Sequence, residues 1–416
     1  MLKSLSQTKV CATYNRTVPG LAFDQARQIV LDQVRSQHRS QLAEPHWERV
    51  ALAETPGRVL AEDLTADRDA PPFDRSMRDG YAVRAADLPG TLAVIGEVRA
   101  GSLFHGSVGE REAVEIMTGA PVPAGADAVV MVEHSDRRDG SVEIGRGAET
   151  GQNICKQGSE ARAGDVVLRA GLRIDYSHVA LAASIGRTRL KVFHRPEVAI
   201  VSTGDEIVAV ESTPEPFQIR NSNAASLAAQ IARAGGIPRH LPIVRDTLAS
   251  TCQALEWAFE SDLVLISGGV SAGKYDVVEP ALASLGAEFF FDRVAIQPGQ
   301  PLVFGRARGK FFFGLPGNPA STMVTFEVFA RAALELLAGH TAPSLLTFHA
   351  RLARDFRQKP GLTRFLPATL VDGEVAPIGW SGSGDINALA RANVFLVTDP
   401  DRTEYAAGDP IRILPK

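Results

Sequence analysis

Three continuous apolar runs alternate with helical segments in the C-terminal half of the chain, and this pattern limits the fold more than any other. The runs are EVAIVST, DLVLIS and KFFFGL, and the helical segments around them are NAASLAAQIARAGG, TLASTCQALEWAFES and PASTMVTFEVFARAALELL. Strands without polar alternation are buried on both faces, so the pattern predicts a parallel α/β sheet covered by helices on both sides. The right-handed crossover rule makes that layer doubly wound.

The remaining segments have different periodicities. Residues 22–42 place apolar side chains at helical spacing, and residues 175–186 form a second predicted helix that ends at Gly186 and is expected to pack on the first. Between them, residues 64–160 consist of short alternating runs and turn dipeptides, which indicates a β-rich insertion. Short strands return after residue 340 and predict a small β domain.

Length, charge and cysteine content exclude several classes of protein. A chain of 416 residues is expected to form two to four domains. Its 44 basic and 48 acidic side chains give a net charge of −4, which excludes a nucleic-acid-binding protein that relies on a strongly positive field. The three scattered cysteines, and the lack of a signal-peptide-like start or an 18-residue apolar run, favour a cytoplasmic protein without a membrane anchor.

In open α/β sheets ligands bind beyond the carboxyl ends of the strands, and polar residues follow each apolar run here. The first run leads into Ser202-Thr203-Gly204-Asp205-Glu206, which carries two adjacent carboxylates. The alternative is that Thr203 and Asp205 only cap the next segment.

The second run leads into a glycine-rich loop, Ser267-Gly268-Gly269-Val270-Ser271-Ala272-Gly273-Lys274-Tyr275-Asp276. Glycines allow successive backbone N–H groups to converge on an anion at a helix N-terminus. The loop fits GxxxxGK, but Tyr275 stands where a Walker A loop has the Ser or Thr that holds Mg²⁺. A P-loop NTPase is therefore a minor alternative.

The third run leads into Gly314-Leu315-Pro316-Gly317-Asn318-Pro319-Ala320-Ser321, where Pro319 suits a first helical turn. The free amides of Ala320 and Ser321 are expected to face an oxyanion, although a plain turn would use the same residues. Because the carboxylates of Asp246 and Asp276 also belong to this edge, we expect a bridging Mg²⁺.

Two loops of the β-rich insertion fix polar groups among Pro and Gly residues. They are the segments around Asp79-Gly80 and around Thr118-Gly119. A simple β-turn at Asp79-Gly80 is the alternative interpretation.

The motifs DGYAV, MTGAPVPAGADAVVMVE, STGDEI, SGGVSAGKYD, QPGQPLVFG and GLPGNPAS follow one another in this order. In this the chain resembles the molybdopterin molybdenumtransferase family, called MoeA in bacteria, and also the C-terminal E domain of gephyrin. The resemblance runs from about Gly20 to the end.

The resemblance implies an α/β molybdopterin-binding domain at 195–339, a discontinuous helical linker domain at 20–63 and 161–194, a β-rich module at 64–160 and a C-terminal β domain at 340–416. It also implies a homodimer with a site shared between subunits, in which adenylylated molybdopterin and molybdate react with Mg²⁺ and release AMP. The adenylyltransferase that precedes it in the pathway and apo-molybdoenzymes are expected partners.

By motif, Asp79 and Thr118 would face the cleft from the β-rich module, and Glu206, Asp246 and Asp276 would bind metal or act in acid–base steps. The pterin and its phosphates would be held by the remaining motif residues: Ser267, Gly268, Gly269, Ser271, Gly273, Pro298, Gly299, Gln300, Gly317, Asn318 and Ser321.

Several positions differ from the family pattern. Arg78 precedes Asp79, Gln300 replaces a frequent lysine, Lys274 stands at an often acidic position and Glu160 replaces an aspartate. The loss of a cation at Gln300 and the change at Lys274 leave open a second function, that of a carrier or scaffold which binds molybdopterin or the finished cofactor without catalysis.

Overall fold

The structure is a computed structural model that describes residues 20–41, 47–269 and 277–416. In this part of the chain there are two compact units: one comprises the residues up to Glu48 with Gly57–Val59 and Phe193–Lys416, and the other comprises Arg49–Pro56 and Leu60–Val192. The multi-domain α/β plus β architecture is confirmed. The four predicted domains divide the chain more finely than these two units, and their boundaries stay predictions.

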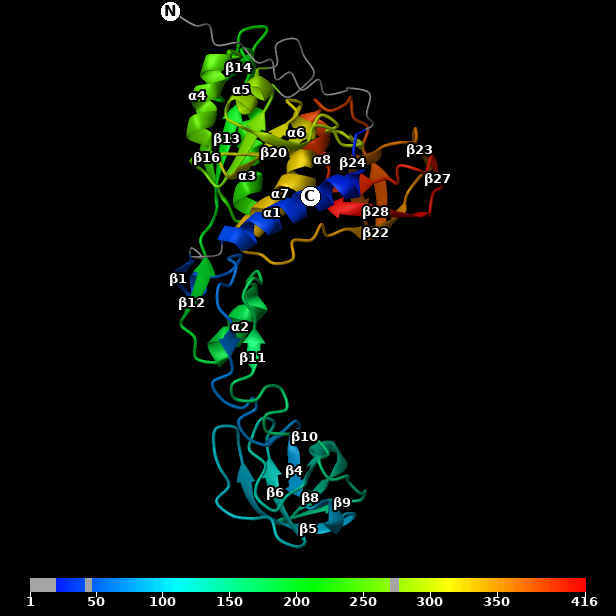
Figure 1. Ribbon diagram of the computed structural model, residues 1–416. Helices are drawn as coiled ribbons and strands as arrows, with labels where there is room; N and C mark the ends of the chain where they lie inside the picture. The colour runs from blue at the N-terminus through cyan, green and yellow to red at the C-terminus, as the bar shows by residue number, and fades with distance from the viewer. Residues whose placement is uncertain (1–19, 42–46, 270–276) are drawn as a thin grey trace, which may run out of the picture. The chain divides into compact units, whose positions relative to one another are not determined.

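The first unit contains a six-stranded mixed sheet (Figure 1). Its strands, in spatial order, are β16 (Ile237–His240), β13 (Glu197–Ser202), β17 (Leu263–Ser267), β21 (Lys310–Leu315), β20 (Val303–Ala307) and β18 (Glu288–Phe291). The first four are parallel, as the apolar runs predicted. β20 runs antiparallel to both β21 and β18, which was not predicted. Arg308 and Gly309 have positive φ and close a two-residue hairpin between β20 and β21.

Helices cover both faces of this sheet. Along β13, Val198 and Ile200 enter one core while Ala199 and Val201 enter the other. The first core is covered by α3 (Ser222–Arg233), α6 (Pro319–Thr325), a π-helical turn η4 (Phe326–Ala330) and α7 (Arg331–Leu337). The second is covered by α4 (Leu248–Ala258) and α5 (Val278–Ser284). The predicted strand and helix segments of this layer are therefore confirmed.

The N-terminal helix α1 (Phe23–Gln41) belongs to the first core rather than to a helical pair. Phe23 packs edge-on against Phe329 and Phe365, with ring centroids 5.5 and 5.3 Å away. The second predicted helix, α2 (Tyr176–Ser184), lies in a core of the other unit. The expectation that it packs on α1 stays a prediction.

The C-terminal segment forms a closed barrel. Its strands pair in the ring β24 (Thr363–Val371), β25 (Glu374–Pro377), β22 (Phe348–Leu352), β28 (Pro410–Pro415) and β26 (Val394–Val397), and β26 pairs back with β24. Two further elements attach it to the α/β layer: β19 (Ile296–Gln297) pairs with β24, and α8 (Ile386–Arg391) packs on α6. The predicted C-terminal β domain is confirmed. The sequence did not predict that its strands close into a barrel.

The second unit is built around another six-stranded sheet. Its spatial order is β7 (Ala128–Met131), β4 (Gly80–Val83), β6 (Glu112–Ile116), β5 (Gly90–Val98), β9 (Ser141–Ile144) and β8 (Asp136–Arg138). The predicted β-rich character is confirmed. Short pairs complete the unit: β10 (Ile154–Cys155) with β3 (Arg75–Ser76), β11 (Val166–Leu168) with β2 (Leu64–Thr65), and β1 (Trp47–Ala51) with β12 (Arg189–Phe193).

Among the described residues, none of the helices is both long enough and apolar enough to span a bilayer.

Candidate functional site

Three loops meet at one edge of the α/β sheet because β13, β17 and β21 are parallel neighbours. Backbone hydrogen bonds hold the loops together: Thr203 N–H donates to Ser267 O over 3.1 Å, and Gly268 N–H donates to Leu315 O over 3.2 Å. The three sequence motifs that end these strands therefore form one surface.

Gly268 and Gly269 allow two of these loops to touch. Gly268 has φ +94°, and a Cβ there would lie 2.7 Å from the carbonyl oxygen of Thr203. Gly269 has φ +63°, and its Cβ would lie 2.6 Å from Cγ2 of Val278. No other residue fits this backbone without displacing its neighbours.

The loops enclose a cleft of about 380 Å³. It brings together most of the predicted sheet-edge residues: Glu206, Asp246, Ser267, Gly268, Gly269, Gly317 and Asn318. Ile207 of β14 (Ile207–Val208) and Ile219 of β15 (Ile219–Arg220) add an apolar side. The cleft thus offers amide donors, carboxylates and an apolar wall to one ligand.

The N-terminus of α3 also lines the cleft, and the sequence analysis did not assign it a role. Asn221 caps this helix by accepting from Ala224 N–H over 3.1 Å. Asn223 Nδ2 donates to Ser267 Oγ over 2.9 Å and to Gly317 O over 2.8 Å, so it ties two loops together. The cap signal in Asn221-Ser222-Asn223 marks the helix start, but only the fold places that start at the sheet edge.

Two polar atoms at this edge have no hydrogen-bond partner in the described chain, Thr203 Oγ1 and Asn223 Oδ1. Thr203 is only 5% exposed. Its hydroxyl caps nothing, so the capping alternative for Thr203 is wrong. A buried oxygen without a partner costs free energy that a bound ligand can recover.

The carboxylates at the edge crowd one another. Burial, followed by the charges of Asp205 and Glu206, raises the pKa of Asp246 above its ordinary value. Within the described residues, no group of three or more His, Cys, Asp or Glu side chains could hold a metal ion. The predicted third ligand, Asp276, lies outside the described residues, together with Ser271 and Gly273.

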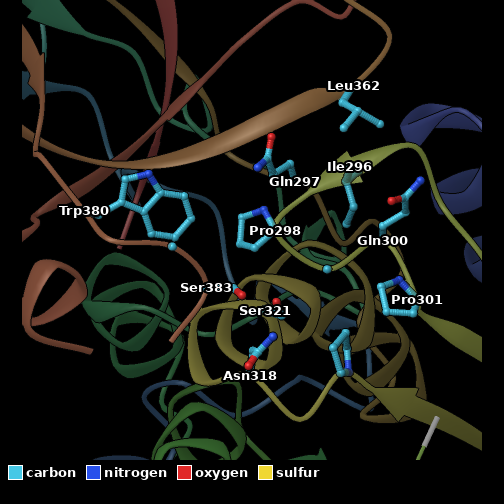
Figure 2. Close-up of a pocket in the computed structure, with 13 residues that line it drawn as sticks. Ile296, Gln297, Pro298, Gln300, Pro301, Asn318, Ser321, Leu362, Trp380 and Ser383 are labelled. Carbon is cyan, nitrogen blue, oxygen red and sulfur yellow. The ribbon is translucent and has the colours of Figure 1, made fainter. Parts of the chain in front are cut away.

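A second pocket of about 310 Å³ lies across Asn318 from the cleft (Figure 2). Of the predicted residues it is lined by Pro298, Gly299, Gln300, Asn318 and Ser321. We call it the neutral pocket, because none of its lining residues carries a charge; the others are Ile296, Gln297, Pro301, Pro316, Leu362, Trp380, Gly382 and Ser383.

The loop Trp380–Ser383 reaches the neutral pocket from the C-terminal barrel segment, which the sequence analysis did not predict. Figure 2 shows the Trp380 ring beside Pro298, and Ser383 next to Ser321. Ala320 N–H donates to Ser383 O over 2.9 Å. Contrary to the expectation from the sequence, this amide is therefore not free to face an oxyanion. The acceptor of the Ala320 amide thus comes from a segment that is distant in the sequence.

Asp79 and Thr118 pair within the second unit. Asp79 lies between β3 and β4, and its Oδ1 accepts from Thr118 N–H over 2.6 Å and from Thr118 Oγ1–H over 2.7 Å. These two bonds, the backbone one first, lower the pKa of the Asp79 carboxyl. Gly80 has φ +157°, and a Cβ there would lie 1.9 Å from Val130 O, so the Asp-Gly turn also has a structural role.

Family models match nearly the whole chain. Residues 21–186 match the MoeA N-terminal region (domain I and II), residues 199–336 match a probable molybdopterin binding domain, and residues 349–416 match the MoeA C-terminal region (domain IV).

Curated relatives and solved structures agree with these matches. The chain is 35% identical over 393 residues to the molybdopterin molybdenumtransferase of Bacillus subtilis, covering 91% of each chain. It is 34% identical over 377 residues to the Staphylococcus epidermidis protein of the same name, covering 88% of this chain and 90% of that one. The molybdopterin biosynthesis MoeA protein of Pyrococcus horikoshii OT3 superposes with a TM-score of 0.77 at 28% identity, over 95% of this chain and 100% of that one.

Gly268→Ala should destabilise the first unit more than Gly286→Ala. Both glycines have positive φ, but a Cβ at Gly286 meets nothing within 4 Å. We expect Gly286→Ala to cost about 1 kcal/mol of unfolding free energy and Gly268→Ala roughly 1–3 kcal/mol more. Urea unfolding followed by tryptophan fluorescence measures this, because Trp257 and Trp380 lie well inside the first unit. Equal costs would contradict the close approach.

Thr118→Val should raise the pKa of Asp79 towards its ordinary value. The hydroxyl bond stabilises the carboxylate form, so its loss favours protonation, although the backbone bond remains. A carboxyl ¹³C NMR titration measures the change. Thr91→Val, at an exposed position of β5, is the control and should leave Asp79 unaffected. An unchanged Asp79 titration in Thr118→Val would contradict the pairing.

Proposed function

Because the chain belongs to the MoeA family of molybdopterin molybdenumtransferases, we propose that it inserts molybdenum from molybdate into adenylylated molybdopterin with release of AMP, in molybdenum cofactor biosynthesis. The observation that carries the proposal is the cleft where three strand-end loops meet beside the N-terminus of α3. Such an edge is where open α/β sheets bind phosphorylated ligands.

The cleft has suitable groups for the phosphates of the pterin substrate. The backbone N–H of Gly269 and the N-terminus of the 12-residue α3 can donate to phosphate oxygens. A hydroxyl or amine of the ligand can bond to Thr203 Oγ1 and Asn223 Oδ1, which have no partner in the described chain. Binding here would fix the phosphate groups relative to the sheet.

Glu206 and Asp246 fit a Mg²⁺ ion that is shared with the substrate. Mg²⁺ is usually bound by one or two carboxylates with phosphate oxygens and water, so two protein ligands suffice. Burial and then the charges of Asp205 and Glu206 raise the pKa of Asp246, and a cation would relieve the repulsion among these carboxylates. When bound, Mg²⁺ would stabilise the negative charge on the pyrophosphate as AMP leaves.

The neutral pocket would hold the other end of the pterin, where molybdenum is inserted. It shares Asn318 with the cleft, so one extended ligand can occupy both. Ser321, Ser383 and Gln300 offer hydrogen-bonding groups without adding charge. The chain's contribution would be to place the dithiolene next to the incoming oxyanion and to keep both in a fixed orientation.

The assembly follows from the family resemblance and is proposed with it. We expect a cytoplasmic homodimer in which Asp79 and Thr118 of one subunit complete the cleft of its partner. The adenylyltransferase that supplies the substrate and the apo-molybdoenzymes that accept the product are the expected protein partners.

Purified protein given adenylylated molybdopterin, molybdate and Mg²⁺ should release AMP and yield cofactor that activates an apo-molybdoenzyme. Asp79→Asn should lower the rate of AMP release at least about tenfold, because a loss of charge at a site residue affects the reaction more than the fold. The control is Asp136→Asn, at an exposed position of β8 in the same unit, which should keep the parent rate.

Each alternative has its own outcome in this assay. Tight pterin binding without AMP release would select the carrier function. ATP hydrolysis that is lost in Lys274→Ala would select the NTPase. No AMP above a protein-free blank would contradict the insertion reaction.

Asp246→Asn should raise the Mg²⁺ concentration needed for half-maximal AMP release, since one of two carboxylate ligands is lost. In the parent the Mg²⁺ requirement should also rise as the pH falls, because the pKa of Asp246 is raised and protons compete with the metal. The control is Asp292→Asn, at an exposed position of the first unit. Coincident Mg²⁺ titrations of Asp246→Asn and the parent would contradict the metal assignment.

A further inference from the structure

A third cavity of about 350 Å³ adjoins the neutral pocket on the side of the C-terminal barrel. The two share Gln297 and Trp380. The other lining residues come mainly from β23 (Phe356–Arg357) and its neighbours: Arg354, Phe356, Arg357, Gln358, Arg364, Leu366, Pro377, Ile378 and Gly379. We call this cavity the basic pocket.

The lining of the basic pocket contains three arginines and no acidic residue. Arg357 has a carboxylate partner, with its Nε 3.4 Å from Glu404 Oε1. Within the described chain, Arg354 and Arg364 have none: Arg354 donates to Pro377 O over 2.8 Å, and Arg364 donates only to neutral oxygens. Two guanidinium charges therefore face one cavity without compensation.

Arg364 is held in a fixed orientation. Its Nε donates to Gln297 Oε1 over 2.8 Å, and its Nη1 donates to Gln358 Oε1 and Lys359 O over 2.9 and 2.6 Å. Gln358 is fixed in turn, because its Nε2 donates to Asp399 O and Arg402 O. These bonds use Nε and Nη1, so within the described chain the two N–H groups of Nη2 are available to a ligand.

The arrangement leaves positive charge on the cavity wall that an anion can neutralise. Burial lowers the pKa of Arg364, which is the sign of a guanidinium removed from water without a nearby carboxylate. A structural arginine at such a place is normally paired with an acid. A fixed guanidinium with free donors instead matches the geometry of an oxyanion.

The position of Gln297 connects the two pockets. Its Oε1 accepts from Arg364, so its Nε2 is left to donate, and Figure 2 shows Gln297 beside Pro298 at the rim of the neutral pocket. The neutral pocket has no cation of its own. The basic pocket next to it offers positive charge that would attract an anion.

We propose that the basic pocket binds a small tetrahedral oxyanion through Arg364 and Arg354, directly beside the neutral pocket. The assignment of the anion rests on the proposed function, which offers two sources. One is free molybdate, delivered next to the dithiolene. The other is the phosphate of AMP, whose base would pack on the faces of Trp380 or Phe356.

The test is isothermal titration calorimetry of the full chain with sodium molybdate, sodium sulfate and AMP, each at low and at physiological ionic strength. We expect saturable binding that weakens with salt. If molybdate and sulfate bind and AMP does not, the site takes the free oxyanion. If only AMP binds, the site takes the nucleotide phosphate. No saturable binding of any of the three would overturn the proposal.

Arg364→Gln should weaken binding at least about tenfold and Arg354→Gln roughly threefold, because each removes a charge-assisted hydrogen-bond donor. Arg354 is exposed, so its variant stays informative if Arg364→Gln fails to fold. The control is Arg351→Gln on β22, at an exposed position outside the pocket. Binding that is equal in all three variants and the parent would overturn the site.

Binding is measured without any pterin, so the two proposals fail separately. Loss of AMP release with anion binding intact would reject the insertion reaction alone. AMP release without an arginine-dependent anion site would reject the basic pocket alone.

Discussion

The contact between the backbone of Gly268 and the carbonyl of Thr203 is the constraint on which the candidate site depends. A Cβ at Gly268 would lie 2.7 Å from that oxygen, so only glycine lets the loop after β17 lie against the loop after β13. Asn223 then fixes the loop after β21 by donating to Gly317 O. Because these contacts are made by backbone and buried side chains, the cleft is formed before any ligand arrives. Within the described chain, Thr203 Oγ1 and Asn223 Oδ1 have no hydrogen-bond partner, and leaving them so costs free energy in the ligand-free cleft.

Charge is divided along the path that a ligand would follow, although the whole chain is close to neutral at −4. The cleft carries the carboxylates of Glu206 and Asp246 together with Arg220, and the adjoining pocket has no charged lining residue. The basic pocket beyond it is lined by three arginines, of which only Arg357 has a carboxylate partner within the described chain. A substrate that carries phosphates at one end and meets an oxyanion at the other would match this order. The net charge of the chain cannot reveal this division, because positive and negative side chains cancel in the sum.

Features that depend on residues close together in the chain, such as the strands and their order, could be predicted from the sequence. Contacts between segments that are distant in the chain could not. Apolar runs located β13, β17 and β21, and their parallel order was enough to bring Glu206, Ser267 and Gly317 together. The same reasoning could not show that Ser383, from the barrel segment, accepts from the amide of Ala320, or that α1 covers the α/β core. Both depend on packing between surfaces that are equally apolar or equally polar in the sequence. Arg364 was missed for the same reason: its lack of an acidic partner is visible only in three dimensions.

The central claim is that one pterin substrate lies across the loops that follow β13, β17 and β21. Hydrogen–deuterium exchange of the full chain with and without adenylylated molybdopterin tests it most directly, because bound phosphate and pterin groups would protect amides that are otherwise open to solvent. We predict slower exchange at Asp205 and Glu206, at Gly269 and at the start of α3, together with the Gln300 loop. Protection confined to other surfaces, with these amides unchanged, would contradict it.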